Sequence, residues 1–258
     1  CCSLSDIDDA RQVAARFGIM HYVYNFKELF GEKVIRNFVE SYERGVTPNP
    51  CIDCNRYIKF DGLLERALSL GCDYVATGHY ARVEYDEERG RWLLKKAVCA
   101  DGENDKDQSY VLYNLTQEQL SHILFPLGSL TKPEVRSLAA KNGLLNAEKP
   151  DSQDICFVPN GKYAEFIEGY TGEKSAPGNV TDTDGKIVGR HNGLINYTIG
   201  QRKGLGIAFG KPAYVVGKNV SDNTLIVGSE QELLSDTLIA DELNWISIES
   251  LTEPIFCK

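Results

Sequence analysis

Hydrophobic residues recur at helical spacing in the first two-thirds of the chain and predict amphipathic helices. Apolar side chains repeat every three or four positions at 5–17, 32–44 and 55–70, and a glycine follows each run. A glycine in that position is typical of a helix end. Two further helices are expected at 117–124 and 132–141. Ser5 and Thr131 each precede an acidic residue at the spacing of a capping box and are predicted N-caps.

Short apolar runs between these helices predict β-strands. The runs at 20–26 and 74–78 each read as a strand, and those at 81–85 and 92–98 flank a charged turn, as in a β-hairpin. Strands that alternate with helices form a parallel sheet covered by helices. The predicted fold class is therefore α/β, with a parallel sheet of the Rossmann-like type.

The pattern changes after residue 161. Gly, Thr, Asp and Asn become frequent, and short β-rich runs such as 214–216 and 224–227 lie between them. This pattern predicts small β-rich modules. We expect an α/β domain at 1–160, a β-rich central domain at 161–230 and the start of a C-terminal β-barrel at 231–258.

Composition narrows the class of protein. The 258 residues are 42% hydrophobic and 25% charged, as in soluble globular proteins. No run reaches the roughly 18 apolar residues of a membrane span, so no membrane partner is expected. The net charge of −9 argues against indiscriminate nucleic-acid binding. Eight irregularly spaced cysteines without a secretory signal indicate a reduced, cytoplasmic location. Because the chain begins with cysteine and has one internal methionine, we expect a fragment cut at both ends.

The segment 47–55 (TPNPCIDCN) contains the densest group of candidate reactive residues. We expect it to place Cys54 at the N-terminus of the third helix, where unpaired N–H groups and the helix dipole stabilise a thiolate. Three roles for Cys54 remain open: a nucleophilic or redox thiol, a metal ligand in a half-site with Cys51, or a small buried side chain. For Cys156 alone, in a polar loop, a buried structural cysteine is the default interpretation, but together with Cys54 it becomes a candidate thiol pair.

Three other segments are candidate contacts with a ligand. Gly78 and His79 follow a predicted strand, and ligands of open α/β sheets bind outside the carboxyl ends of strands. A strand-ending turn explains Gly78 equally well. The segment 106–110 (KDQSY) suits either a solvated turn or contact with folded RNA. The loop 198–207 (TIGQRKGLGI) is basic and rich in glycine, which suits phosphate contact, but it matches neither dinucleotide nor P-loop fingerprints.

Taken in order, these motifs resemble those of the bacterial tRNA-specific 2-thiouridylases, the MnmA/TrmU family. The resemblance rests on TPNPxxxCN with IKF at 58–60, ATGHY at 76–80, KDQSY at 106–110, ICF at 155–157 and IGQRKGLG at 199–206. It implies a nucleotide hydrolase-type α/β domain and an enzyme that uses ATP and Mg²⁺. Such an enzyme adenylates the C2 oxygen of the wobble uridine of tRNA and replaces that oxygen with sulfur. A sulfur donor protein, a cysteine desulfurase or a sulfur-relay protein, is the implied second partner.

The resemblance also implies roles for individual residues. Cys156 corresponds to the cysteine that carries a persulfide, and Cys54 to the cysteine that attacks it and releases the sulfur. Gly78 corresponds to an ATP contact. The implied tRNA contacts are Asn49, Pro50, Cys51, His79, Lys106, Asp107 and Gln108.

Two departures from the family pattern affect these expectations. The family's N-terminal ATP loop and most of its last barrel have no counterpart here, so we expect the fragment alone to be inactive. Cys51 replaces a frequent aspartate, so Cys51, Cys54 and Cys156 together suit an iron–sulfur cluster as an alternative to the persulfide. A metal-binding RNA-recognition module without catalysis, and another ATP-dependent thiolase or amide synthetase of the same fold, are the competing functions.

Overall fold

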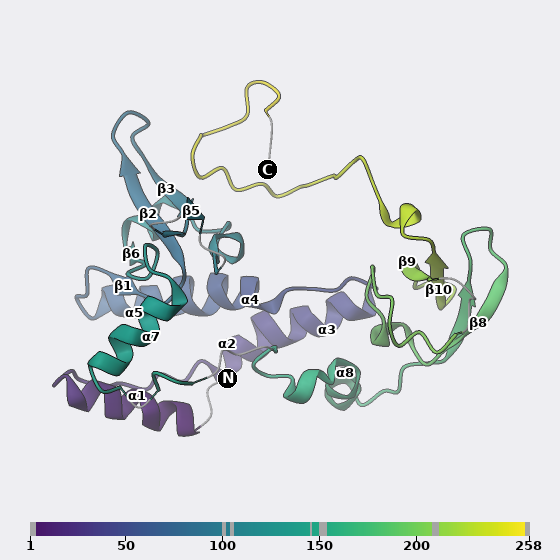
Figure 1. The fold of residues 1–258 in the computed structure, drawn as a ribbon, viewed down its shortest axis with the longest axis horizontal. Helices are drawn as coiled ribbons and strands as arrows, with labels where there is room; N and C mark the ends of the chain where they lie inside the picture. Colours follow the sequence, from purple (N-terminus) through teal and green to yellow (C-terminus); the bar gives the residue numbers. More distant parts are fainter. Residues whose placement is uncertain are drawn as a thin grey trace. The chain divides into compact units, whose positions relative to one another are not determined.

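The computed structural model of the protein describes residues 4–99, 102–103, 106–144, 146–149, 154–207 and 212–255. The chain divides into two compact units, whose elements are drawn in Figure 1. Unit 1 comprises the described residues within 1–33, 51–151 and 241–258, and unit 2 those within 34–50 and 152–240. The domain boundaries expected near 160 and 230 remain a prediction.

Most helices of the first 144 residues lie where the apolar periodicity predicts them, but those at 27–30 and 50–53 lie outside the predicted ranges. The helices are α1 (Leu4–Arg16), α2 (Lys27–Phe30), η1 (Gly31–Ile35), α3 (Arg36–Glu43), α4 (Pro50–Asp53), η2 (Cys54–Leu63), α5 (Leu64–Ser69), α6 (Gln117–Ser121) and α7 (Lys132–Lys141). The capping box of α7 is confirmed, because Thr131 accepts from the amide of Glu134 at 3.4 Å and Glu134 accepts from that of Thr131 at 2.7 Å. The prediction for Ser5 is wrong, because Ser5 lies inside α1.

Unit 1 contains short strands. They are β1 (Val75–Ala76), β2 (Ala81–Asp86), β3 (Arg91–Lys96), β4 (Val98–Cys99), β5 (Gly102–Glu103) and β6 (Ile123–Leu124). The parallel pair is β1 with β6, and the predicted hairpin is β2 with β3, which projects from the unit in Figure 1. The last residues of the helix predicted at 117–124 form β6 instead. The amides of Val75 and Thr77 donate to the carbonyls of His122 and Leu124, so the end of this segment pairs as a strand.

The strand predicted at 20–26 is wrong. These residues form an extended segment without a ladder, and Met20, Tyr22 and Val23 are exposed. A strand requires a hydrogen-bonded neighbour, and among the described residues no segment pairs with this one. The alternation of the side chains alone therefore does not make a strand here.

The core of unit 1 joins η2 to the hairpin and to the segment 111–125. Its buried members are Phe60, Ala81, Val111, Leu112, Leu115, Leu120, Ile123 and Phe125. Residues from the C-terminal part of the chain cover one side of it, because Arg91 donates to the carbonyls of Trp245 and Ile246 and Asn244 donates to those of Tyr113 and Leu115. The start of a barrel is expected at 231–258; within this range the structure describes residues 231–255, and none of these lies in a strand.

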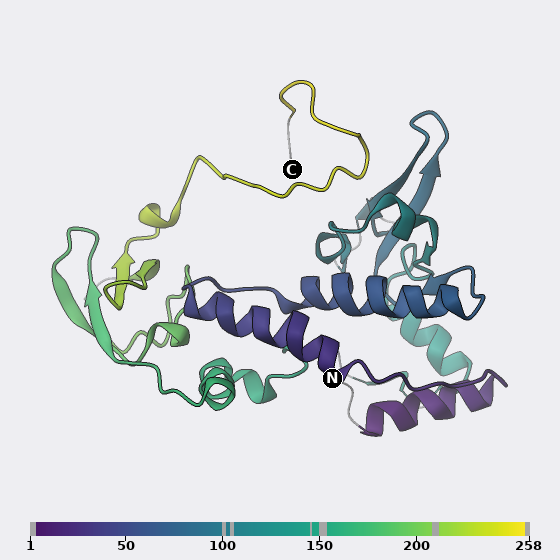
Figure 2. The same ribbon diagram turned by 180° about the vertical axis from the view of Figure 1, so that it is seen from behind.

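Unit 2 combines helix α3 with a small sheet. Its further elements are η4 (Pro159–Gly161), α8 (Tyr163–Thr171), β7 (Gly178–Thr181), β8 (Ile187–His191), η5 (Leu194–Asn196), β9 (Tyr214–Asn219), β10 (Thr224–Gly228) and η6 (Gln231–Leu233). The strand order is β8-β7-β10-β9, with β7 and β10 parallel; Figure 2 shows these strands from behind. One core lies on this sheet, and another packs α3 against α8 and the segment 155–158.

None of the helices formed by the described residues has the length and apolar character needed to span a membrane.

Candidate functional site

The helix that carries Cys54 begins earlier than the sequence predicts. Its first turn is α4, which starts at Pro50. Proline suits that position, since its fixed φ is helical and no amide hydrogen is needed there. Cys54 therefore lies one turn inside the helix, and the prediction that it occupies the helix N-terminus is wrong. Cys51 lies in the first turn instead, where the effect of the helix dipole is strongest.

Cys54 is the first residue of η2, a π-helical stretch of 10 residues. π-Helical turns are rare and frequently mark functional sites. They pair residue i with residue i+5, so Cys54 and Lys59 lie about one turn apart on the same side of the helix. Cys51 is exposed and Cys54 is half-buried, so neither thiol is sealed inside the core.

Gly78 lies at the carboxyl end of the parallel pair. The amide of Thr77 donates to the carbonyl of Leu124 at 3.1 Å, which is the last ladder bond before Gly78. Gly78 is exposed, and a Cβ atom placed on it would meet only Leu127, at 3.7 Å. A ligand can therefore approach the backbone here, at the edge where α/β sheets bind nucleotides.

His79 follows Gly78 but is buried, with 8% of its surface exposed. Its Nδ1 lies 2.7 Å from Oγ1 of Thr77, and its Nε2 lies 3.3 Å from the ammonium of Lys59. Burial, with a smaller effect of the Lys59 charge, lowers the pKa of His79 to about 4. The imidazole is thus neutral near pH 7. Because an ammonium can only donate, Nε2 accepts and Nδ1 carries the proton.

In the segment 106–108, the first side chain is exposed to solvent, and the other two form hydrogen bonds within unit 1. Lys106 is exposed. Asp107 accepts from the amide of Ala97 at 2.8 Å and from the hydroxyl of Ser109 at 2.7 Å. Gln108 and Tyr80 exchange two bonds, from the Tyr80 amide to Oε1 of Gln108 at 3.0 Å and from the Gln108 amide to the Tyr80 carbonyl at 2.8 Å. Their side chains therefore fix this segment beside the end of β1.

Asn55 is a buried polar residue that the sequence interpretation did not single out. It is 2% exposed, and its Nδ2 donates to the carbonyl of Val111 at 3.2 Å. This bond ties the helix that carries Cys54 to the turn after Gln108. A polar residue directly after Cys54, in an otherwise apolar stripe of the helix, is the sequence signal that could have indicated it.

Unit 2 contains the remaining predicted residues. Asn49 is exposed and Pro50 is buried. Cys156 is exposed in a turn closed by the bond from the Val158 amide to the Ile155 carbonyl, at 2.9 Å. Phe157 packs edge-on against Phe38 of α3, with ring centroids 5.3 Å apart. An exposed thiol between anchored neighbours has a defined position, which suits group transfer.

The basic loop is held against the segment that precedes Pro50. Thr47 and Thr198 meet through their hydroxyls at 3.4 Å. Gln201 shapes the loop by accepting from the Thr198 amide at 3.0 Å and donating to the Lys203 carbonyl at 2.9 Å, while Arg202 and Lys203 stay exposed. Two motifs about 150 positions apart in sequence thus share one surface of unit 2.

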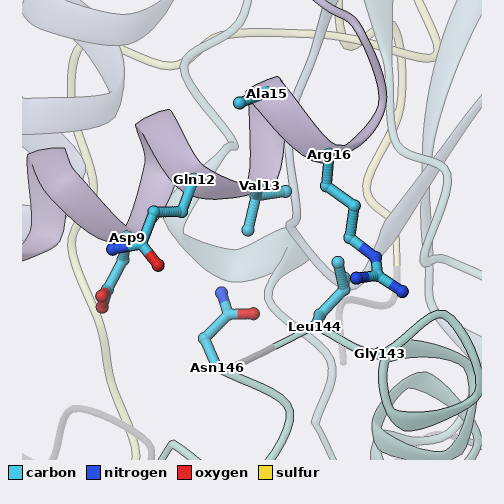
Figure 3. Close-up of a pocket in the computed structure, with 8 residues that line it drawn as sticks. All are labelled: Asp9, Gln12, Val13, Ala15, Arg16, Gly143, Leu144 and Asn146. Carbon is cyan, nitrogen blue, oxygen red and sulfur yellow. The ribbon is translucent and has the colours of Figure 1, made fainter.

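A cavity of about 440 Å³ in unit 1 lies between α1 and the loop after α7 (Figure 3). Asp9, Gln12, Arg16, Leu144 and Asn146 are among the residues that line it. None of the predicted site residues lines this cavity, so we assign the candidate chemistry to the end of β1 instead.

Within either unit, the described residues contain no group of three or more His, Cys, Asp or Glu side chains placed to hold a metal ion. Cys51 and Cys54 belong to unit 1 and Cys156 to unit 2.

An accessible glycine at the carboxyl end of parallel strands suits a nucleotide-binding α/β protein, and comparison with known proteins is more specific. Residues 1–160 match the family model described as the tRNA methyl transferase HUP domain, and residues 164–229 match the tRNA methyl transferase PRC-barrel domain. The chain is 54% identical over all 258 residues to the tRNA-specific 2-thiouridylase MnmA of Acetivibrio thermocellus, of which it covers 71%. It is 57% identical over 258 residues to MnmA 1 of Thermoanaerobacter sp. and 51% identical over 255 residues to MnmA of Clostridioides difficile, and covers 70% of each.

The chain belongs to the MnmA/TrmU family. The predicted fold class is confirmed: a Rossmann-like α/β domain of the HUP type, with a parallel strand pair and helices, is followed by a domain of the PRC-barrel type.

Proposed function

We propose that the protein is a tRNA-uridine 2-sulfurtransferase, which replaces the C2 oxygen of the wobble uridine with sulfur. The observation that carries this proposal is the match to 2-thiouridylases across the whole chain. The thiols support it: Cys54 lies on a π-helical stretch near the sheet edge, and Cys156 lies on an anchored, exposed turn.

The chemistry requires activation of a poor electrophile. The C2 oxygen attacks the α-phosphate of ATP, pyrophosphate leaves, and the oxygen becomes part of a good leaving group. We propose that Cys156 carries a persulfide from a sulfur donor protein. The Cys54 thiolate attacks the Cys156 sulfur, hydrosulfide is released, and a disulfide forms. Hydrosulfide then displaces AMP from C2, and an external thiol reductant returns two electrons to the disulfide.

ATP fits the open end of β1, where Gly78 leaves the backbone accessible. When bound, ATP supplies the adenylyl group, and Mg²⁺ would accompany its phosphates. For tRNA, the proposed contacts with exposed side chains are Asn49, Cys51 and Lys106. Pro50, His79, Asp107 and Gln108 are buried or internally bonded in this structure, so any contribution from them to tRNA binding would come through backbone or through positioning. We propose a cytoplasmic location.

The test uses the full-length protein with unmodified tRNA, ATP and a persulfide donor. Pyrophosphate release and 2-thiouridine are measured together. Cys156→Ser should abolish 2-thiouridine while pyrophosphate release continues, and the matched variant Cys72→Ser, at an exposed cysteine outside the proposed site, should behave as wild type. Normal thiolation by Cys156→Ser would overturn the proposed role of Cys156.

Methyl transfer is the second candidate, since the matching family model carries that description. The same tRNA product separates the two reactions by mass spectrometry, because one exchanges oxygen for sulfur and the other adds a methyl group. A methylated product formed with a methyl donor, and no thiolated product, would replace the thiolation proposal.

A further inference from the structure

Lys59 is a half-buried cation with an unusual partner. Its ammonium lies 3.3 Å from Nε2 of His79. Among the residues that the structure describes, no carboxylate forms an ion pair with it. Its position in η2, five residues after Cys54, directs it toward the end of β1 rather than into bulk solvent.

His79 fixes this ammonium without neutralising it. The ring is held from one side by Thr77 and packs against Phe60 and Phe125, with ring centroids 5.9 and 5.8 Å away. A carboxylate in the same place would cancel the charge of Lys59. A neutral acceptor orients the ammonium, leaves its positive charge in place and leaves two of its three N–H donors for another group.

The other group is expected at the backbone of Gly78. His79 directly follows this exposed glycine, at the carboxyl end of the parallel pair. An uncompensated ammonium with unused donors, beside an accessible backbone, suits a phosphate group, since charge-assisted hydrogen bonds to phosphate are stronger than neutral ones.

We propose that Lys59 binds a phosphate group of the nucleotide at this edge, and that His79 is the positioning residue that holds the Lys59 ammonium there. The identity of the nucleotide as ATP rests on the proposed function. The role assigned to His79 differs from the direct tRNA contact that the family resemblance implies, because both ring nitrogens already have partners within the unit.

The first test compares nucleotide and tRNA affinity in the full-length protein. Lys59→Gln should raise the dissociation constant of ATP about tenfold or more, which is about 1.4 kcal/mol, and Lys59→Arg should restore part of it. The matched control is Lys33→Gln, since Lys33 is also half-buried but pairs with Glu32 at 3.2 Å. Affinity for tRNA without nucleotide should stay unchanged in all three variants.

The second test follows the protonation of His79 by NMR. Because the charge of Lys59 contributes to the low pKa of His79, Lys59→Gln should raise that pKa. Inorganic pyrophosphate should raise it in the wild type, by screening the ammonium, and should have no effect in Lys59→Gln. A purely structural lysine would not respond to pyrophosphate in this way.

Two results would overturn the proposal. One is unchanged ATP affinity in Lys59→Gln, and the other is a loss of tRNA affinity in place of ATP affinity, which would mean that the ammonium faces RNA. A wild-type protein that binds ATP through Lys59 but makes no 2-thiouridine would overturn the proposed function alone. Thermal unfolding checks that each variant is folded. If Lys59→Gln does not fold, the ATP affinity of Lys59→Arg still tests the proposal.

Discussion

Lys59 and His79 join the helix that carries Cys54 to the carboxyl end of β1, through a contact of 3.3 Å between the ammonium and Nε2. The contact connects two of the sequence motifs, IKF at 58–60 and ATGHY at 76–80. Burial lowers the pKa of His79 to about 4, so the ring that meets the Lys59 ammonium is neutral. The chemistry of this edge is therefore that of a fixed cation beside a neutral acceptor.

The burial of His79 predicts a loss of stability in mild acid. Its folded-state pKa is about 4, below the ordinary value of 6.5 for histidine, so between these values the unfolded chain binds a proton that the folded chain does not. The free energy of unfolding should therefore fall as the pH drops from about 6.5 to about 4, by about 3 kcal/mol from this residue. Urea denaturation at several pH values measures it.

The control for this prediction is His79→Gln, which keeps a polar side chain but does not titrate. Lys59, Thr77, Phe60 and Phe125 face the ring, so Lys59 is the charged neighbour that both proteins share. The difference between the two stabilities should shrink with acid. Parallel pH curves would contradict the assignment of the low pKa to His79.

Substitution by alanine should destabilise the protein at one glycine of unit 1 and leave its stability nearly unchanged at another. A Cβ atom on Gly128 would lie 2.0 Å from the carbonyl oxygen of Ala81, whereas one on Gly78 would lie 3.7 Å from its nearest neighbour. Gly128→Ala should lower the free energy of unfolding by about 3 kcal/mol, because the backbone has to shift. Gly78→Ala should change it by less than about 0.5 kcal/mol but weaken ATP binding. Equal stability losses would show that Gly78 is structural.

Asn55 should be important for stability, because its buried amide bonds to the carbonyl of Val111 at 3.2 Å. Asn55→Ala leaves that carbonyl without this donor, at an expected cost of about 1–3 kcal/mol. Asn142 is the matched control: its amide donates to Leu138 at 2.8 Å on the surface, so Asn142→Ala should cost less than about 0.5 kcal/mol. Chemical denaturation measures the free energy of unfolding of both variants. An unchanged free energy of unfolding in Asn55→Ala would contradict a stabilising role for the buried bond.

Cys51 distinguishes the persulfide route from an iron–sulfur cluster. Under the persulfide route, Cys51→Ser should still form 2-thiouridine, and any loss should be in tRNA affinity, because Cys51 is a proposed tRNA contact and not a sulfur carrier. Anaerobically purified full-length protein should then hold no stoichiometric iron or acid-labile sulfide. Under the cluster alternative, serine at Cys51, Cys54 or Cys156 should each remove iron and activity together. Iron and sulfide analysis beside the tRNA assay separates the two.

The sequence by itself determined the local elements and the family. Apolar spacing with a following glycine predicted α1, α3 and α5, and apolar spacing with the Thr131 cap predicted α7. Two apolar runs around a charged turn predicted the hairpin β2–β3. These features depend on a few neighbouring residues. The capping box at Thr131 followed for the same reason. The motif order indicated the family, which the comparisons then showed.

Only the tertiary structure decided which side chains work together. A strand at 20–26 failed because a ladder needs a neighbour that no local pattern supplies, and the end of the predicted helix at 117–124 became β6 because β1 lies beside it. Cys54 lies inside a helix that begins at Pro50, and not at the N-terminus of a helix as predicted. His79 became buried and paired with Lys59, 20 positions away, because burial and hydrogen bonding between distant segments depend on packing, which no sequence spacing encodes.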